Sequence, residues 1–276
     1  MAARKDINRR DFVRAGAALL AAPLAARGAA TDPYRGLKVG VHSYSLRNFS
    51  LEQALVMTRE LGLRYFGINP RHLALQSSPE QITEARRKIA DAGLTLLATG
   101  VIGMSKDKEK TRRAFDYAKA LGIKVIVCNP EHDSFDTLDA LVEEYDMRLA
   151  IHNHGPGSLY STPDDVLKAI KGHDPRIGAC VDMGHFERSD VRAGDALRAL
   201  KGHIYDIHLK DVDRRDKKGE SVVMGTGVID FEDVFKTLIA TKCPWHVAME
   251  YEADADNPLP GMEKSLEFAR NVLAKL

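Results

Sequence analysis

Short apolar runs and longer amphipathic segments alternate along the chain from residue 37 onward. The apolar runs are rich in Val, Ile and Leu, which is typical of strands that are buried on both faces. They begin near Lys38, Arg64, Leu94, Lys124, Arg148, Ile177, His203 and His246. Most starts lie roughly 25–30 residues apart, the length of one strand, one helix and the loops that join them. The pattern therefore predicts eight consecutive strand–helix units.

The amphipathic segments carry the start signals of helices. Ser50 precedes a segment in which apolar residues recur at helical spacing. Ser78 and Thr162 are each followed by a proline, a combination that is typical of an N-cap and the first helical residue. Asp230 is also a typical N-cap. We therefore expect helices to begin directly after these four residues.

Eight such units within about 240 residues fit a closed (β/α)8 barrel, the TIM-barrel architecture of the α/β class. An open, doubly wound sheet is the alternative. That fold often has a GxGxxG turn after its first strand, and this chain has none there. No linker or low-complexity tract interrupts the pattern, so we predict one barrel domain over residues 31–276.

One connection, between Leu209 and Asp230, is long, charged and then rich in glycine. Long loops in compact domains are often functional, and a loop that follows a barrel strand lies on the active-site face. The sequence Gly225-Thr226-Gly227 either closes over a substrate or forms the turn before Asp230. Both interpretations are consistent with the sequence.

Residues 1–30 have the layout of an export signal: basic residues, a short apolar run and then small residues ending at Ala30. The pair Arg9-Arg10 resembles the twin-arginine form, which carries folded proteins across the bacterial inner membrane. We therefore predict a signal peptide over 1–30, recognition by the twin-arginine export machinery, and a periplasmic or secreted protein. The alternative is an amphipathic helix that stays attached. The apolar run is too short to span a bilayer, so we expect no stable membrane insertion.

Charge and cysteine content exclude several classes of protein. The chain has 40 Lys and Arg against 39 Asp and Glu, a net charge of +1, which argues against a nucleic-acid binder. The three cysteines (Cys128, Cys180 and Cys243) are too few and too scattered for a disulfide framework. Cys128 and Cys180 lie inside apolar runs, so we expect free, buried thiols. The sequence is compatible with an oligomer as well as with a monomer.

Polar residues gather at the carboxyl ends of the last four predicted strands. Alternate residues of a barrel strand face the interior, and the others pack on the helices. We expect the interior to receive His152 and His154 from strand five, Asp182 from strand six, Asp206, His208 and Lys210 from strand seven, and Glu250 and Glu252 from strand eight. We expect the helices to contact Leu149, Ile151, Val181, Tyr205, Ile207, Leu209, Val247, Met249 and Tyr251.

The histidines follow the same pattern. Seven of the ten are expected on the active-site side: His42, His72, His132, His152, His154, His185 and His208. The other three, His173, His203 and His246, are expected on the opposite rim.

The four residues His152, Asp182, His208 and Glu250 form a candidate metal site. Burying imidazoles and carboxylates together is costly unless a cation neutralises them. Two imidazoles and two carboxylates suit Mn²⁺, Zn²⁺, Co²⁺ or Fe²⁺ better than Mg²⁺ or Ca²⁺. The alternatives are that the histidines are hydrogen-bonded interior residues, that Asp182 caps the following turn, and that Glu250 pairs with Lys210.

Several segments resemble those of the xylose-isomerase-like barrel superfamily, which includes sugar phosphate isomerases, ketose 3-epimerases, inosose dehydratases and class II apurinic endonucleases. The segments are VHSYSLR, IHNHGP, CVDMGH, IHLKDV, MGTGVIDF and MEYE, and the resemblance covers roughly residues 37–275. It implies one divalent metal ion held by a Glu on strand five, an Asp on strand six, a His on strand seven and a Glu on strand eight. Asp182, His208 and Glu250 match this set, whereas His152 replaces the first Glu.

The resemblance also implies a reaction. It indicates a divalent-metal-dependent sugar isomerase or epimerase that moves a proton at a carbon next to a carbonyl. Glu250 is then the base, with His154 or Lys210 as the second acid/base. His185, from the Asp-x-x-His motif, becomes a substrate ligand together with His42 and Glu252. Lys210 has a structural alternative, an ion pair with Asp211 or Glu252.

The replacement of the strand-five Glu leaves two further functions open. The first is a keto-sugar lyase or dehydratase of the same superfamily, because the pair of acid/base carboxylates is broken. The second is a non-catalytic periplasmic sugar-binding barrel. The endonuclease branch is disfavoured, because strand three ends in ATGVIG and carries no ligand. The expected partner is therefore a small sugar or keto-sugar and not a nucleic acid.

Overall fold

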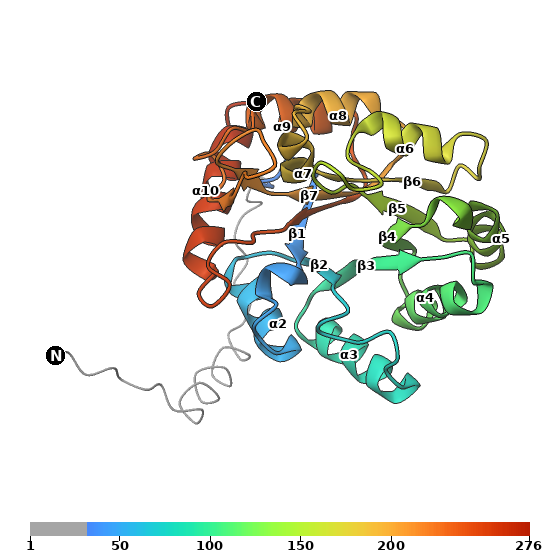
Figure 1. The fold of residues 1–276 in the computed structure, drawn as a ribbon. Helices are drawn as coiled ribbons and strands as arrows, with labels where there is room; N and C mark the ends of the chain where they lie inside the picture. The colour runs from blue at the N-terminus through green and yellow to red at the C-terminus, as the bar shows by residue number, and fades with distance from the viewer. Residues whose placement is uncertain (1–31) are drawn as a thin grey trace. The chain divides into compact units, whose positions relative to one another are not determined.

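The computed structural model describes residues 32–276, so the predicted export signal lies outside the described residues. Eight parallel strands close into a barrel in the order β1-β10-β7-β6-β5-β4-β3-β2, with helices between successive strands on the outside (Figure 1). The strands are β1 (Lys38–His42), β2 (Tyr65–Ile68), β3 (Thr95–Met104), β4 (Val125–Pro130), β5 (Arg148–His152), β6 (Ile177–Asp182), β7 (Ile204–Leu209) and β10 (His246–Met249). The predicted (β/α)8 barrel is confirmed, and each strand begins within one residue of its predicted start.

Four of the helices begin directly after the N-caps predicted for them, Ser50, Ser78, Thr162 and Asp230. The α-helices are α2 (Leu51–Glu60), α3 (Pro79–Asp91), α4 (Lys108–Leu121), α5 (Phe135–Tyr145), α6 (Pro163–Ile170), α7 (Met183–Arg188), α8 (Ala193–Ala199), α9 (Phe231–Ala240) and α10 (Leu259–Leu273). Two short 3-10 helices, η2 (Ser43–Leu46) and η3 (His132–Ser134), follow β1 and β4. The side chains of Ser50, Ser78, Thr162 and Asp230 each accept a backbone N–H in the first turn of their helix. Across residues 32–276, none of the helices combines the length and the apolar character needed to cross a membrane.

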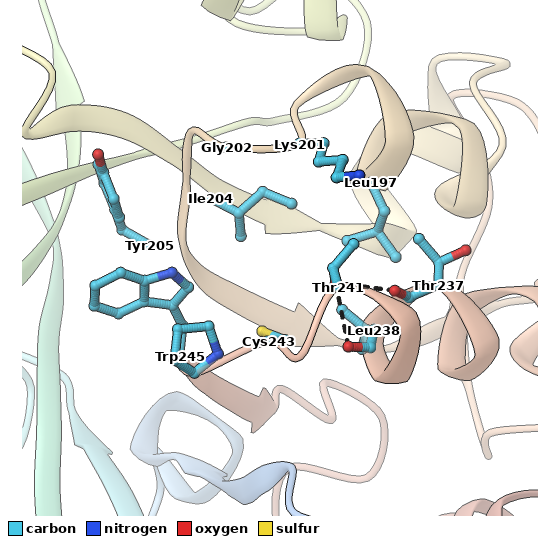
Figure 2. Close-up of a pocket in the computed structure, with 11 residues that line it drawn as sticks. Leu197, Lys201, Gly202, Ile204, Tyr205, Thr237, Leu238, Thr241, Cys243 and Trp245 are labelled. Carbon is cyan, nitrogen blue, oxygen red and sulfur yellow. Dashed lines mark hydrogen bonds between the residues drawn. The ribbon is translucent and has the colours of Figure 1, made fainter.

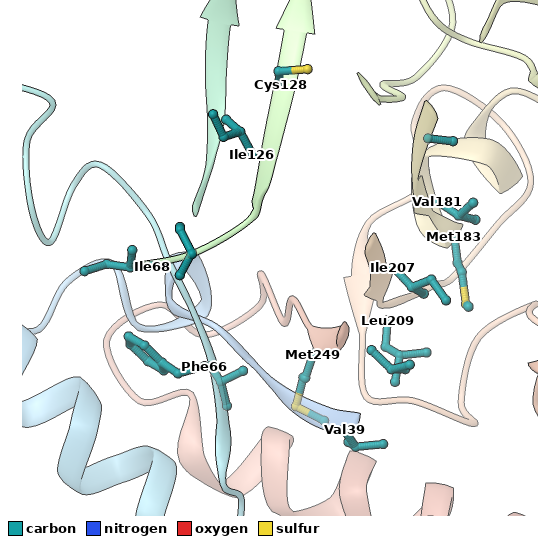
Figure 3. Packing of buried hydrophobic residues seen from close by; sticks show 14 of the residues in the cluster. Val39, Phe66, Ile68, Ile126, Cys128, Val181, Met183, Ile207, Leu209 and Met249 are labelled. Atoms are coloured by element: carbon teal, nitrogen blue, oxygen red, sulfur yellow. The ribbon is translucent and has the colours of Figure 1, made fainter. Parts of the chain in front are cut away.

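The main hydrophobic core lies between the barrel and the helices (Figure 3). Val181, Ile207, Leu209 and Met249, all predicted to face the helices, are buried in it. Complete burial of one such side chain contributes about 1.5–3 kcal/mol, so turning a strand over would be costly. This layer therefore fixes which side chains of β6, β7 and β10 point into the barrel.

Tyr205 is an exception, and its predicted contact with the helices is wrong. Ala179 pairs with Ile204, but Cys180 pairs with Asp206, so Tyr205 is an extra residue in β7. Such a bulge changes the direction of one side chain. The ring of Tyr205 belongs to the smaller buried cluster inside the barrel. Because the bulge lies near the start of β7, the later residues of the strand keep the predicted alternation.

The long connection after β7 is an ordered hairpin. It contains two short antiparallel strands, β8 (Asp211–Val212) and β9 (Ser221–Val222). The Asp211 carboxylate accepts the N–H groups of Gly225 and Gly227 at 2.9 and 3.0 Å. A Cβ atom on Gly227 would lie 2.3 Å from Oδ1 of Asp211, so only glycine fits there. The Gly-Thr-Gly segment is therefore a turn wrapped around Asp211.

The cysteines agree with the prediction. Cys128, Cys180 and Cys243 are all buried and form no disulfide. Burial raises the pKa of the Cys180 thiol to about 12, so this group stays protonated at neutral pH.

Candidate metal centre and active site

Four side chains meet at the carboxyl ends of adjacent strands. His152 and Asp182 are the last residues of β5 and β6, His208 lies one residue before the end of β7, and Glu250 directly follows β10. All four are at most 4% exposed. The shared register Asp182↔His208 holds two of them side by side. The predicted convergence is therefore present in the structure.

The donor atoms have the spacing of a metal site. One ligand atom from each of the four residues lies within 4.8 Å of the other three. His152 Nε2 lies 3.0 Å from His208 Nδ1 and 3.4 Å from Asp182 Oδ2, and His208 Nδ1 lies 3.3 Å from Glu250 Oε2. Four ligands at about 2.1 Å in a tetrahedral shell are about 3.4 Å apart. Asp182 Oδ2 is buried and accepts no hydrogen bond among residues 32–276, although the Lys210 ammonium lies 3.0 Å away. The donor set therefore fits one divalent cation.

Two side chains that the sequence analysis missed hold the backbone of these ligands in place. Asn153 is fully buried; its amide donates to the carbonyl of Asp182 at 2.9 Å and accepts the Asp182 N–H at 2.8 Å. Ser45 donates to the carbonyl of Met249 at 3.2 Å and accepts the N–H of Tyr251 at 2.8 Å. Glu250 lies between those two residues. Asn153 is adjacent to a candidate ligand in the sequence, whereas no local signal points to Ser45.

Lys210 is fully buried among carboxylates. Its Nζ lies 2.7 Å from Glu250 Oε2, 3.0 Å from Asp182 Oδ2 and 3.2 Å from Glu252 Oε2. The predicted ion pair with Glu252 is present, whereas Asp211 binds backbone N–H groups of its own loop. The alternatives considered for the carboxylates also occur. Asp182 caps α7 through Oδ1 while Oδ2 faces the cluster, and Glu250 pairs with Lys210.

His42 lies beneath Glu250 and not at the mouth. Its Nδ1 lies 2.8 Å from Glu250 Oε1, and its Nε2 lies 3.0 Å from the carbonyl oxygen of Gly100. Its ring stacks on that of His208 with centroids 4.5 Å apart. Both ring nitrogens are therefore engaged, and in this structure His42 orients Glu250.

His154 and His185 lie on the outer side of the candidate metal ligands. The ring centroid of His154 is 4.6 Å from that of His152 and 5.1 Å from that of His185. Arg188 donates to Nδ1 of His185 at 3.1 Å, so the ring proton of neutral His185 is on Nε2. The Glu252 side chain is 26% exposed at the same rim. These groups are therefore the candidates for contact with a molecule bound at the mouth.

The remaining histidines are more varied than predicted. His72 bonds to Ser43 and to the Leu46 carbonyl near the site, and His173 pairs with Asp139 at the surface. His246 was expected on the opposite rim, and this is wrong. It is 3% exposed, and its ring lies inside the barrel. The space for it exists because Gly40 and Gly67 on β1 and β2 have no side chain.

The charges of the site are set by burial and by Lys210. Burial raises the pKa of Asp182 and of Glu250, but the Lys210 ammonium and the neighbouring histidines together outweigh it and hold both pKa values well below their usual range. Burial lowers the pKa of His152 to about 4 and that of His185 to about 2, so both rings are neutral at pH 7. The pKa of His154 is lowered too, chiefly by burial. Burial lowers the pKa of His208 too, but the neighbouring anionic groups, Glu250 and Asp182 among them, outweigh it and hold that pKa well above its usual range. The site thus offers anionic oxygens and the neutral imidazole of His152, the forms that bind cations, and a cation would have to displace a proton from His208.

A separate cavity of about 280 Å³ lies at the opposite, amino-terminal end of the strands (Figure 2). It is lined mainly by apolar side chains, among them Leu197, Ile204, Leu238 and Trp245. None of the candidate ligands lines it. The candidate site is therefore the mouth at the carboxyl ends of the strands.

The fold and the site define a (β/α)8 barrel with a candidate metal centre at the carboxyl ends of its strands. Residues 55–272 match the model of one family, described as xylose isomerase-like TIM barrel, and the chain belongs to that family. Its similar relatives include an inosose dehydratase of Clostridium perfringens, 28% identical over 212 residues that cover 60% of this chain and 69% of the relative. An inosose dehydratase of Klebsiella pneumoniae is 31% identical over 155 residues, half of each chain.

Solved structures show the same fold. A protein from Parabacteroides distasonis is 28% identical and superposes with a TM-score of 0.67 over 86% of this chain and 99% of its own. An L-ribulose 3-epimerase is 19% identical, with a TM-score of 0.68 over 87% of this chain and 95% of its own. A probable 3-DHS dehydratase of Bacillus anthracis is 15% identical, with a TM-score of 0.68 over 84% of this chain and 99% of its own. At such identities the last two likenesses concern the fold alone.

Proposed function

We propose that this protein is a metal-dependent lyase of the dehydratase type that acts on a keto-sugar. The observation that carries the proposal is that the site offers one uncommitted acid/base group. The ring of His154 packs against that of His152, and within residues 32–276 it makes no hydrogen bond. The rings of His152, His208 and His185 are each hydrogen-bonded. An epimerase needs two such groups, one on each face of the reacting carbon. The relatives named inosose dehydratase also support the lyase alternative better than the isomerase or epimerase expectation.

His152, Asp182, His208 and Glu250 hold the metal ion in this proposal, with His152 in the place of a fifth-strand Glu. When bound, Mn²⁺, Zn²⁺, Co²⁺ or Fe²⁺ supplies a Lewis acid for the carbonyl oxygen of the substrate. All other steps belong to side chains of the chain itself.

His154 moves the proton. As a neutral imidazole it accepts the hydrogen of the carbon next to the carbonyl. The electron pair of that C–H bond forms the new C=C bond, and the C–O bond to the hydroxyl on the next carbon breaks. His154 then returns the proton to the departing hydroxyl, which leaves as water. One group acting on one face of the substrate is sufficient for this sequence of steps.

The other polar groups bind the substrate or position the side chains around it. His185 donates its Nε2–H to a substrate oxygen, because Arg188 occupies its Nδ1. Glu252 accepts a hydrogen bond from a substrate hydroxyl at the rim. Lys210 is buried between Glu252 and the two carboxylate ligands, so we assign it to positioning.

The base predicted from the sequence was Glu250, and the geometry favours His154 in that role. One oxygen of Glu250 bonds to His42 and the other pairs with Lys210. Its pKa is also held well below the usual range, which makes it a weak proton acceptor. Glu250 therefore stays a metal ligand in the proposal.

The test follows the reaction of a panel of unphosphorylated keto-sugars by NMR in D2O, with metal-loaded protein. We expect loss of the proton next to the carbonyl and formation of an unsaturated product. His154→Gln should lose about 100-fold or more in rate while retaining metal. His132→Gln, at an exposed histidine that follows β4, is the matched control and should stay active. Deuterium uptake with an epimeric product would indicate an epimerase, and sugar binding without exchange would indicate a binding protein.

We also propose that residues 1–30 direct export by the twin-arginine route to the periplasm or beyond. The support is the sequence of this segment alone, with Arg9-Arg10 followed by an apolar run and small residues. A free, unphosphorylated substrate is consistent with such a location.

A further inference from the structure

A second layer of buried polar groups lies beneath the candidate metal centre. Asp206 and His246 are 1% and 3% exposed, and their side chains face each other inside the barrel. Asp206 Oδ1 lies 3.7 Å from Nε2 of His208, and Oδ2 lies 3.8 Å from Nδ1 of His246. The carboxylate therefore lies between a predicted metal ligand and a second imidazole.

The polar atoms of these side chains lack hydrogen-bond partners in the described residues. Both oxygens of Asp206, both ring nitrogens of His246 and Nε2 of His208 have no hydrogen bond in the described part of the chain. Buried polar atoms are nearly always paired, because an unpaired one costs about 1–3 kcal/mol. Separations of 3.7 and 3.8 Å are about 0.8 Å longer than a hydrogen bond. A small rotation of the carboxylate, or one bridging water, would pair the atoms.

Two glycines on neighbouring strands leave the space that the ring of His246 occupies. A Cβ on Gly40 would lie 2.5 Å from Nε2 of His246, and one on Gly67 would lie 3.2 Å from its Cε1. A side chain at Gly40 would therefore collide with the imidazole. The pairing Asp206↔His246 in the sheet register keeps the two residues at the same height.

We propose that Asp206 is a positioning residue that fixes which nitrogen of His208 binds the metal. The carboxylate accepts the Nε2–H of His208, which leaves the lone pair on Nδ1. That atom faces Glu250 at 3.3 Å and Asp182 at 3.7 Å, where the cation is expected. His246 donates its Nδ1–H to the other oxygen of Asp206 and holds the carboxylate in place.

This inference rests on the proposed metal site. It predicts that loss of the Asp206 carboxylate weakens the affinity of the protein for the metal ion. Without the carboxylate, His208 populates both neutral tautomers, and only the one with a proton on Nε2 can bind through Nδ1. Carboxylates that orient a metal-binding histidine in this way contribute about 10- to 100-fold to metal affinity. Asp206→Asn removes the carboxyl group with almost no change of shape.

The experiment compares the Mn²⁺ affinity of the wild-type protein, Asp206→Asn and a control, by competition with a chelator. Asp206→Asn should bind about 10- to 100-fold more weakly. The control, Asp174→Asn, carries the same chemical change in the loop before β6 and should bind like the wild type. If the wild type binds no metal, the proposed function fails. If the wild type and Asp206→Asn bind equally, the role of Asp206 is overturned.

A second readout needs no folded variant. Long-range ¹H–¹⁵N spectra of the wild-type protein loaded with Zn²⁺ report which nitrogen of His208 carries the proton. The inference requires a proton on Nε2 and the metal on Nδ1. The opposite assignment would overturn it, whether or not Asp206→Asn folds.

Discussion

Replacing Lys210 by Met tests how the site balances its charges. The ammonium is fully buried and lies within 3.2 Å of oxygens from Asp182, Glu250 and Glu252. Methionine fills a similar volume without a charge. In Lys210→Met these carboxylates lose the buried cation that pairs with all three of them.

The expected loss is large in the absence of metal. Removing one partner of a buried ion pair costs about 3–5 kcal/mol, a sizeable part of the total stability of a domain. A divalent cation bound by Asp182 and Glu250 would replace the missing charge. It stabilises the folded state by about 4 kcal/mol at a concentration 1,000 times its dissociation constant. Lys210→Met should therefore be strongly destabilised in chelator and recover most of the loss in saturating metal.

The assay is urea denaturation of the wild type and of Lys210→Met, each in EDTA and in Mn²⁺. Metal should stabilise the variant more than the wild type, because the competing ammonium is gone. Lys236→Met is the control: Lys236 pairs with Glu232 at the exposed surface of α9, so its loss should matter little in either buffer. An equal loss of stability with and without metal would refute the reasoning, since the cation would then not replace the ammonium.

Three further predictions address the backbone of the candidate ligand Asp182, the half-buried imidazole of His185 and export. Asn153→Ala loses two buried hydrogen bonds to Asp182 and should lower the free energy of unfolding by about 2–4 kcal/mol in urea denaturation. A decrease below about 0.5 kcal/mol would contradict a stabilising role for these two hydrogen bonds. His185 stays neutral in the fold, because its pKa is lowered to about 2, but takes up a proton near pH 6.5 when unfolded. Stability should thus fall as the pH drops from 6.5 towards 4, and His185→Gln should make this slope shallower by about 1.4 kcal/mol per pH unit; an unchanged slope would exclude a neutral His185 ring in the folded state. Replacing Arg9 and Arg10 by Lys should retain the uncleaved protein in the cytoplasm on cell fractionation, and continued export would exclude the twin-arginine route.

The fold was readable from the sequence because its signals are local. Strand facing follows from alternation, so the direction of Val181 and Asp182 can be derived from the strand itself. The extra residue Tyr205 could not be foreseen, because a bulge depends on the register with the neighbouring strand. The hairpin after β7 depends likewise on Asp211 meeting a turn 14 residues further on.

The candidate ligands could be predicted from the sequence, but the contacts that orient them could not. His152, Asp182, His208 and Glu250 converge as expected, since strands in a barrel end at one face. The orientation of Glu250 by His42 joins residues 208 positions apart, and no local pattern contains that contact. The interior place of His246 likewise requires knowledge of which strands lie opposite it.

The most direct test of the central claim is a crystal structure of the protein grown with Mn²⁺, with anomalous diffraction data to locate the ion. Our account predicts one anomalous peak about 2.0–2.3 Å from His152 Nε2, Asp182 Oδ2, His208 Nδ1 and an oxygen of Glu250. An ion bound elsewhere, or these four side chains free of metal at saturating Mn²⁺, would contradict it.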